Sequence, residues 1–283
     1  MRSYVRHSSS VINHIKSLRT SGSTLTEIVS KTGLSKSTVL GHIQNIPRSE
    51  YLIEKIRAIR LEAQNKMAAQ RRGKSLKNYT FLKPEKWSPD LVNLIAHFLF
   101  DGRITRTSCT YYNRSEALVN LMEQKMRSLL RVSDHKKYIT AEGVTRLAYF
   151  NVEIAFFIKK KADELFDHIQ FAPRNEKISF LKAFFDDEGC MRFRKNNRIV
   201  RGYQHSIEIL EIVRGLLKDL GIESIVDKRF FEINIYRKEN IIKFQEMINF
   251  TPGLRVNGNR TNSVWKKDLE KREILQMAVD SYL

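Results

Sequence analysis

Two stretches of the sequence share one pattern, an apolar helix that ends in an acidic residue followed by glycine. The first, LVNLIAHFLFDG, covers residues 91–102, and the second, ISFLKAFFDDEG, covers residues 178–189. Their closing glycines lie 87 residues apart (189 − 102). Helices this apolar must bury most of their surface against other elements. The pattern therefore predicts two related halves that pack together through these helices.

The segments after each helix follow the same order along the chain. The runs RITRTSCTYY and CMRFRKNNRIVRGYQHS are rich in alternating strand-forming residues, and Asn196-Asn197 is the expected hairpin tip of the second. A further helix, a strand pattern at 146–152 or 230–236, and a last helix complete each half. A period near ninety residues indicates two halves and excludes a solenoid. We predict an α+β fold with two pseudo-symmetric αββαββα repeats that form a saddle-shaped antiparallel sheet.

The region before the repeats carries short helical patterns around a glycine. In TLTEIVSKTGLSKSTVLGHIQNI two amphipathic helices flank a turn at Gly33, and Pro47 ends the second. This layout is typical of a helix-turn-helix, whose second helix faces the major groove of DNA. A three-helix bundle without a DNA-binding role is the alternative. The side chains expected to contact DNA there are Lys36, Ser37, Thr38 and His42.

These patterns divide the chain into four parts. We expect a helix-turn-helix domain at 1–48 and a basic helical connector at 49–86. The first repeat is expected at 87–174, and the second at 175–283 together with a C-terminal helix. The connector could lie along a phosphate backbone or serve as a solvated tether.

The charge of the chain indicates a polyanionic partner. Lys and Arg number 50 against 31 Asp and Glu, a formal net charge of +19. Each cation that neutralises a phosphate releases a condensed counterion, so this excess favours nucleic acid, with an anionic membrane surface as the second choice. Residues 1–80 hold 15 basic and 4 acidic residues, a net of +11, which leaves +8 for the rest. We expect double-stranded DNA as the partner.

Several other classes of protein are excluded by what the sequence lacks. It has no apolar run of membrane-spanning length, and its start, MRSYVRHSSS, is unlike a signal peptide. Cys109 and Cys190 form no metal-binding or disulfide pattern, and no nucleotide-binding or serine-hydrolase motif occurs. We expect a cytoplasmic, nucleoid-associated protein with no membrane partner, monomeric because both halves lie in one chain.

The strand runs contain a set of arginines suited to phosphate contacts. In the second repeat arginines alternate with Met191, Phe193, Ile199 and Tyr203, which predicts one apolar and one basic sheet face. An ordinary solvated face is the alternative. The expected DNA-contacting residues of the strands are Arg103, Arg106, Arg192, Arg194, Arg198 and Arg201.

The two acidic-glycine motifs, LIAHFLFDG at 94–102 and LKAFFDDEG at 181–189, resemble the paired motifs of LAGLIDADG homing endonucleases. The resemblance covers about residues 87–270, and the spacing suits the single-chain, two-repeat form of that family. It implies metal-dependent cleavage of double-stranded DNA, with one strand cut per half-site. The catalytic and metal-binding carboxylates would be Asp101 and Glu188; glutamate replaces the family's aspartate at the second position.

The residues themselves make such a site reasonable. Ala96 and Ala183 are small enough for the two helix axes to approach closely. A carboxylate at a helix C-terminus is unfavourable unless a cation bridges it. Mg²⁺ or another divalent cation suits two carboxylates plus water and phosphate oxygens, and would activate water. Asp187 remains a rival to Glu188 as the second carboxylate.

The basic residues of the site and the activity of the repeats each have more than one candidate. The family also places a basic residue near each active site, and Lys177 is a candidate, as are Arg174, Arg255, Lys137 and Lys228. The same repeats could also form a non-catalytic DNA-binding transcription regulator or an RNA maturase. A helix-turn-helix favours the regulator, whereas a pair of carboxylates favours the endonuclease.

Overall fold

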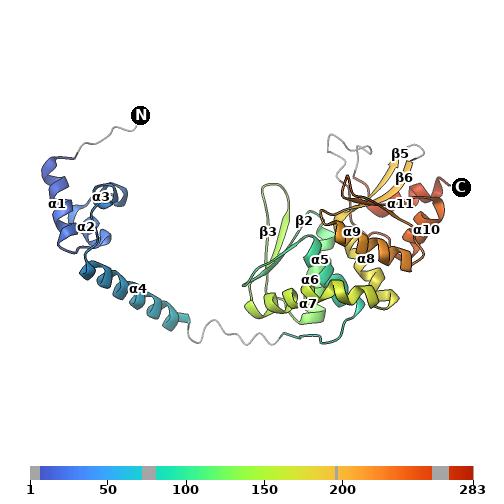
Figure 1. The fold of residues 1–283 in the computed structure, drawn as a ribbon, viewed down its shortest axis with the longest axis horizontal. Helices are drawn as coiled ribbons and strands as arrows, with labels where there is room; N and C mark the ends of the chain where they lie inside the picture. The colour runs from blue at the N-terminus through green and yellow to red at the C-terminus, as the bar shows by residue number, and fades with distance from the viewer. Residues whose placement is uncertain (1–6, 72–80, 195–196, 257–267, 283) are drawn as a thin grey trace. The chain divides into compact units, whose positions relative to one another are not determined.

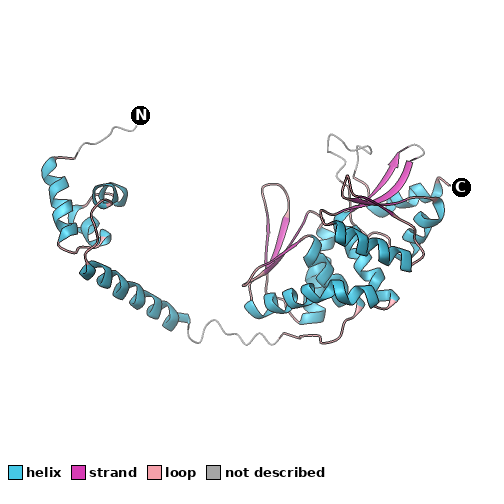
Figure 2. Cartoon of the chain, viewed as in Figure 1, coloured by secondary structure: helices cyan, strands magenta, loops and turns pink. Residues whose placement is uncertain are grey.

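The computed structural model describes residues 7–71, 81–194, 197–256 and 268–282 (Figures 1 and 2). The chain divides into two compact units, Met1–Tyr79 and Thr80–Leu283. Among the described residues, no helix is long and apolar enough to cross a membrane. Each unit has its own hydrophobic core, so the two are treated separately.

The first unit is entirely helical. Its small core consists of Ile15, Ile28, Val39 and Ile43, which come from the first three helices and are almost completely buried. The amphipathic spacing of these residues explains why three short helices can pack into one bundle. The helices of this unit are α1 (Ser9–Thr20), α2 (Leu25–Thr32), α3 (Lys36–Ile43) and α4 (Glu50–Arg71).

Local sequence signals determine where α2 and α3 begin and end. Thr24 and Glu27 form a reciprocal capping box at the start of α2. Gly33 ends α2 with a φ of 66°, a left-handed conformation that suits glycine. Ser35 then caps α3 by accepting a hydrogen bond from the Thr38 N–H. The two helices and the glycine turn predicted from the sequence are therefore present.

Helix α4 is attached to this bundle only at its beginning. Leu52 is completely buried, and Lys55 forms an ion pair with Glu27 at 2.9 Å. From Arg57 to Met67 every described side chain is exposed. The helix therefore presents a long solvated surface with both charged and apolar side chains.

The second unit contains the predicted αββαββα order twice. In this chain a new strand begins directly after the acidic end of α5 and of α8, and a pair of strands follows each middle helix. The first repeat consists of α5 (Pro89–Phe100), β1 (Gly102–Ile104), β2 (Cys109–Asn113), α6 (Glu116–Leu130), β3 (Lys136–Ile139), β4 (Thr145–Tyr149) and α7 (Val152–Phe171). The second consists of α8 (Arg174–Glu188), β5 (Gly189–Arg194), β6 (Asn197–Tyr203), α9 (Ile207–Asp219), β7 (Ile225–Asp227), β8 (Glu232–Ile235) and α10 (Lys238–Met247), followed by α11 (Lys271–Asp280).

Each repeat forms its own four-stranded antiparallel sheet with the same strand order. The orders are β1-β2-β4-β3 and β5-β6-β8-β7. In both, the glycine after the acidic residue pairs with the second strand, Gly102 with Tyr111 and Gly189 with Gly202. At the predicted hairpin tip, Asn197 pairs with Arg194, whereas Asn196 lies outside the described residues.

The two repeats are joined by the pair α5 and α8, which pack along one another in the middle of the unit (Figure 1). Ala96 and Ala183 are fully buried in these helices, as their small size suggested. Side chains of both repeats belong to one continuous core. This packing places the acidic ends of the two helices within one site.

Candidate functional site

Asp101 and Glu188 lie at the C-terminal ends of the central helices. Asp101 is the C-cap of α5, and Glu188 is the last residue of α8. Both are half-buried, so a ligand from solvent can reach them while much of their hydration is lost. The pseudo-symmetric repeat thus delivers one carboxylate from each half.

The glycines that follow these acids are required because the backbone passes very close to a carbonyl oxygen of the preceding helix. A Cβ added to Gly102 would lie 2.2 Å from the carbonyl oxygen of Phe98. A Cβ on Gly189 would lie 2.4 Å from the carbonyl oxygen of Phe185. Only glycine lets the strand leave the helix end so tightly, and the equivalence of the two clashes reflects the repeat.

The two carboxylates are harder to ionise than ordinary acids. Burial raises the pKa of Asp101 to about 8, and the negative charges of Asp187 and Glu188 add to this effect. Burial also raises the pKa of Glu188 to about 7, again with a contribution from Asp187. The nearby cation Lys271 opposes both shifts without cancelling them. A bound cation would therefore favour the ionised form of both acids.

The residues present suit a cation that takes few protein ligands. No group of three or more His, Cys, Asp or Glu side chains placed to hold a metal occurs among the described residues. Asp101 and Glu188 could supply two carboxylates to a divalent cation, with water and phosphate oxygens completing its coordination. The fit is thus to Mg²⁺-like chemistry and not to a protein-enclosed zinc site.

Lys271, the first residue of α11, is the basic side chain that lies at this site. Its Nζ donates a hydrogen bond to the backbone oxygen of Asp186 at 2.8 Å. Burial lowers the pKa of Lys271, while the surrounding carboxylates, Asp186 first among the side chains, raise it. No motif in the sequence links α11 to the end of α8, so Lys271 was not among the predicted site residues.

Lys177 does not take the place that the sequence suggested. It lies in the first turn of α8, where its Nζ donates to Asp219 at 2.5 Å. Glu188 ends the same helix, about 16 Å further along at 1.5 Å per residue. Lys177 therefore lies at the opposite end of α8 from the acids and not beside them, as the sequence had suggested. The other candidates are engaged elsewhere or exposed, namely Arg174, Lys137, Arg255 and Lys228.

Asp187, the rival to Glu188, is committed to internal contacts. Its side chain is completely buried and contacts His97 Nδ1 through Oδ2 at 2.8 Å. Its Oδ1 accepts a hydrogen bond from the hydroxyl of Tyr111 at 2.7 Å. Burial alone would lower the pKa of His97, but the charge and hydrogen bond of Asp187 raise it above its ordinary value. Both oxygens of Asp187 are thus used within the protein.

Asn113 connects this internal group to the first acid. Its Nδ2 donates to Asp101 Oδ2 at 2.8 Å and to the Tyr111 hydroxyl at 3.1 Å, and lies 3.4 Å from Asp187 Oδ1. Its Oδ1 accepts from the Ser115 N–H at 2.8 Å, which fixes the direction of the amide. No sequence signal identified Asn113, whose partners are contributed by α5, β2 and α8.

The arginines of the second sheet do not share one face. Paired residues of neighbouring strands point to the same face of a sheet. Arg192 pairs with Ile199 and Arg194 with Asn197, and both arginines are exposed on the outer face. Arg201 shares this face but is half-buried and forms an ion pair with Glu232 at 3.1 Å.

Arg198 lies on the opposite, core-side face, which corrects its expected place. It pairs with Phe193 in the β5–β6 ladder. Its guanidinium donates to Ser281 and lies 4.5 Å from the ring centre of Tyr282, just after α11. The hairpin changes the relation between residue number and face, because the two strands meet through Arg194 and Asn197. These contacts give Arg198 a structural role in holding the C-terminal segment.

The first sheet presents a basic and aromatic outer face. Arg103 is exposed in β1 and Arg106 in the loop that follows it. The guanidinium of Arg146 lies over Tyr112 at 5.1 Å and Tyr138 at 4.7 Å from the ring centres. Sequence alone did not identify Arg146, because the cross-strand pairing of three separate strands creates this stack.

The side chains chosen on α3 differ in their availability. Lys36 and Ser37 are exposed at the start of the helix. Thr38 is half-buried, with its hydroxyl 2.8 Å from that of Ser35. His42 is also half-buried and packs edge-on against His7. Lys36 is therefore the freest of the four to contact a ligand, since the exposed Ser37 hydroxyl also lies 3.0 Å from that of Ser35.

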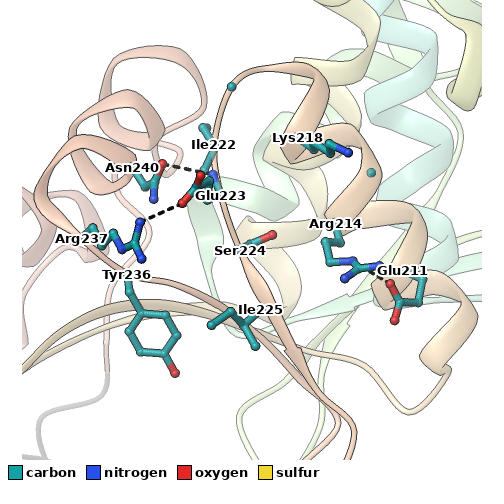
Figure 3. Close-up of a pocket in the computed structure, with 12 residues that line it drawn as sticks. Glu211, Arg214, Lys218, Ile222, Glu223, Ser224, Ile225, Tyr236, Arg237 and Asn240 are labelled. Atoms are coloured by element: carbon teal, nitrogen blue, oxygen red, sulfur yellow. Dashed lines mark hydrogen bonds and ion pairs between the residues drawn. The ribbon is translucent and has the colours of Figure 1, made fainter.

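A pocket of about 810 Å³ lies elsewhere in the second repeat, between α9, the start of β7 and the start of α10 (Figure 3). Two ion pairs form its walls, Arg214 with Glu211 at 2.7 Å and Arg237 with Glu223 at 3.1 Å (Figure 3). The carboxylates at the ends of α5 and α8 do not line it. The pocket is separate from the acidic site.

Comparisons with known proteins find one family and several solved structures that are similar to this chain. Residues 175–249 match the family described as LAGLIDADG-like domain. No curated protein matches the chain. A solved variant of the homing endonuclease I-DmoI, in complex with its target DNA in the presence of Mg, is 20% identical over 56% of this chain and 95% of that one, with a TM-score of 0.45.

Two further solved structures are similar at the same level. The N-terminal LAGLIDADG domain of DUF199/WhiA is 17% identical over 60% of this chain and 87% of that one, with a TM-score of 0.44. Full-length DUF199/WhiA from Thermatoga maritima is 16% identical, with a TM-score of 0.45. That match covers 71% of this chain and 63% of the other protein.

Proposed function

We propose that this chain, whose residues 175–249 match the LAGLIDADG-like domain family, is a site-specific, metal-dependent DNA endonuclease. The observation that supports this proposal is the pair of half-buried carboxylates at the matching ends of α5 and α8, both with raised pKa. A structural acid has little reason to be placed twice, in register, where ionisation is unfavourable. A divalent cation and a phosphodiester would use this arrangement.

The chemistry can be assigned to named groups. A bound divalent cation would neutralise phosphate charge and activate water at the site. Asp101 and Glu188 would hold it, one carboxylate serving each half-site. Lys271 supplies a basic amine beside the carboxylates, and Asn113 orients Asp101. These groups favour the negative charge that develops on a phosphate during hydrolysis.

The outer faces of the two sheets are the proposed DNA-binding surface. Arg103 and Arg146 of the first sheet, and Arg192 and Arg194 of the second, would contact phosphates or bases. Lys36 and Ser37 of α3 would contact a further stretch of DNA, as in a helix-turn-helix. One chain contains both half-sites, so the working form is proposed to be a monomer.

A non-catalytic DNA-binding regulator is the second candidate. The observation that favours it is the separate helical unit, Met1–Tyr79, with a capped and exposed start of α3. Such a unit could direct binding without any cutting. The solved I-DmoI and DUF199/WhiA structures have TM-scores below 0.5 and do not decide between these candidates.

Cleavage of DNA in the presence of Mg²⁺ tests the proposal. Duplexes selected from a random pool by binding to the protein serve as substrates, and Asp101→Asn and Glu188→Gln are compared with the wild-type chain. We expect double-strand cleavage that needs Mg²⁺ and that falls by about 100-fold or more in either variant. The control is Asp219→Asn, an exposed acid paired with Lys177, which should leave cleavage unchanged.

Two outcomes would contradict the proposal. Undiminished cleavage by both variants would show that these carboxylates are not the catalytic pair. Tight, selective binding by a wild-type protein that cuts neither strand with Mg²⁺ or Mn²⁺ would identify the regulator.

A further inference from the structure

The two half-sites carry matching acids but unlike surroundings. The repeat offset of 87 residues makes Asp101 equivalent to Glu188. The same offset pairs His97 with Phe184 and Phe100 with Asp187. A polar contact between α5 and α8 on one side of the pseudo-two-fold axis is therefore an apolar contact on the other.

The first half-site is surrounded by a continuous set of hydrogen bonds. Asp187 of α8 crosses into this half and contacts His97 of α5 at 2.8 Å. The hydroxyl of Tyr111 donates to Asp187 at 2.7 Å, so its oxygen is free to accept from Asn113 at 3.1 Å. Asn113 in turn donates to the carboxylate of Asp101 at 2.8 Å. Four side chains of three elements thus converge on one acid.

At the equivalent positions the second half-site has two phenylalanines and a glycine, and Gln204 where the first half-site has Asn113. Phe100 and Phe184 pack edge to face with ring centres 5.2 Å apart. Gly202 occupies the strand position of Tyr111, and a Cβ there would lie 2.4 Å from the ring of Phe184. Among the described residues, no side chain forms a hydrogen bond or ion pair with the carboxylate of Glu188.

Two hydrogen-bond directions in the first half-site are defined. The Tyr111 hydroxyl donates to Asp187 Oδ1. The Asn113 oxygen is held by the Ser115 N–H, so its amino group points toward Asp101. Rearranging the buried Asp187 carboxylate would break its contacts with His97 and Tyr111, which is costly. The network therefore holds Asp101 in one orientation before any substrate binds.

We propose that Asp187 and Tyr111 are positioning residues that act through Asn113 to orient the Asp101 carboxylate, and that cleavage of only one DNA strand depends on them. This inference rests on the proposed endonuclease function. It predicts that the two strands are cut by half-sites of unequal pre-organisation. Cleavage of the DNA strand served by Asp101 needs the hydrogen-bond network, and cleavage of the DNA strand served by Glu188 does not.

Strand-resolved cleavage is the first test. Duplex substrate labelled with a different fluorophore on each strand reports both rates under single turnover, and Asp101→Asn and Glu188→Gln define which strand each acid serves. Tyr111→Phe removes one hydroxyl and keeps the ring, while Asp187→Asn removes the charge. We expect both variants to slow the Asp101 strand by about tenfold or more relative to the other strand.

The matched control is Asp186→Asn. Asp186 is the buried neighbour of Asp187, but its side chain binds Thr251 through the backbone N–H at 2.8 Å and the hydroxyl at 2.6 Å. This variant should slow the two strands equally or not at all. Equal slowing of both strands by Tyr111→Phe would overturn the inference, because a general loss of structure has no strand preference.

A second measurement does not depend on cleavage. In protein labelled with ¹⁵N-asparagine, the side-chain amide signals of Asn113 are identified by their absence in Asn113→Ala. We expect slow hydrogen exchange for these signals in the wild-type protein and in Asp186→Asn, and fast exchange in Tyr111→Phe and Asp187→Asn. Unchanged exchange in the last two variants would overturn the inference. If the wild-type protein cuts no DNA, the proposed function fails, while this measurement still decides the positioning role.

Discussion

At the scale of single residues, Asp101 and Glu188 combine two opposing demands. They are buried enough to raise the pKa of each carboxyl group, yet open enough to meet a ligand. The same position at the end of a helix adds an unfavourable interaction with the helix dipole. A protein that keeps both acids there must gain from them something other than stability.

This conflict makes stability depend on pH in a defined direction. The pKa values of about 8 for Asp101 and about 7 for Glu188 exceed the ordinary values of 3.8 and 4.5. The folded protein therefore holds more protons than the unfolded chain between about pH 4 and pH 8. Stability present below pH 4 is lost as the pH rises through 7 and 8. At about 1.4 kcal/mol per pKa unit, we expect these two groups together to lower the metal-free free energy of unfolding by about 6 kcal/mol between pH 5 and pH 8.5.

Urea unfolding in the presence of a chelator measures this effect. The double variant Asp101→Asn/Glu188→Gln should lose that part of the pH dependence, and Mg²⁺ should stabilise the wild-type protein at pH 8.5 more than at pH 5. An identical pH profile for the double variant would show that the two carboxyl groups titrate normally.

Sequence reasoning at this scale identified the acids but not their partners. The acids stand in a repeated local motif, whereas Asp187 contacts His97 and Tyr111, which are 90 and 76 positions away. Lys271 is likewise contributed by a helix with no motif of its own. Only packing brings such residues together, so no local pattern could have named them.

At the scale of elements, the glycine after each acid determines how a helix becomes a strand. Gly102 and Gly189 both sit where a Cβ would collide with the carbonyl oxygen four residues earlier. The turn is so tight that the first strand begins at the glycine itself. The acidic-glycine ending is thus a geometric requirement as well as a chemical motif.

Substitution by alanine tests this requirement. Gly102→Ala and Gly189→Ala should each lower the free energy of unfolding by about 2–4 kcal/mol, because the backbone must shift. Gly215→Ala is the matched control, since this helical glycine of α9 has open space at its Cβ position and should gain about 0.5–1 kcal/mol. Thermal and urea unfolding give the values. Equal effects at all three positions would contradict the assigned clashes.

In the strands, unlike at the glycines, the local sequence pattern was not sufficient. Alternation alone assigned one arginine to the wrong face of the sheet. Arg198 follows the same numerical pattern as Arg192 and Arg194 in the sequence. Its pairing with Phe193 places it on the core side of the sheet. A strand pattern gives alternation within a strand, but the relation between two strands depends on where the hairpin closes.

At the scale of the whole molecule, the positive charge is distributed between two separate units. Residues 1–80 carry a net charge of +11 and the remainder +8. The division at Tyr79 assigns the larger excess to the helical unit and α4. Most of the non-specific attraction to DNA should therefore come from the smaller part of the protein.

Removal of residues 1–79 tests this distribution. We expect the remaining chain, 80–283, to bind random duplex DNA more weakly. The slope of its binding constant against salt concentration should be shallower, by an amount that corresponds to the loss of about 3–6 phosphate contacts. The full chain with Lys36→Ala and Ser37→Ala is the control, and should lose about one contact. The dependence of the binding constant on salt concentration provides the slope. An unchanged slope after truncation would place the phosphate contacts on the repeats.

The sequence by itself determined the repeat, the αββαββα order, the helical unit before it and the two acids. Each of these is encoded by local spacing, capping or turn chemistry, or by a repeated motif. The tertiary structure decided the rest: the separate sheets, the face of Arg198, the place of Lys177 and the entry of Asp187 into the opposite half-site. These features depend on contacts between residues tens of positions apart, whose energies arise only when α5 and α8 pack and the strands pair. An ideal repeat would give two equal half-sites, and it is the packing of unlike side chains that makes them different.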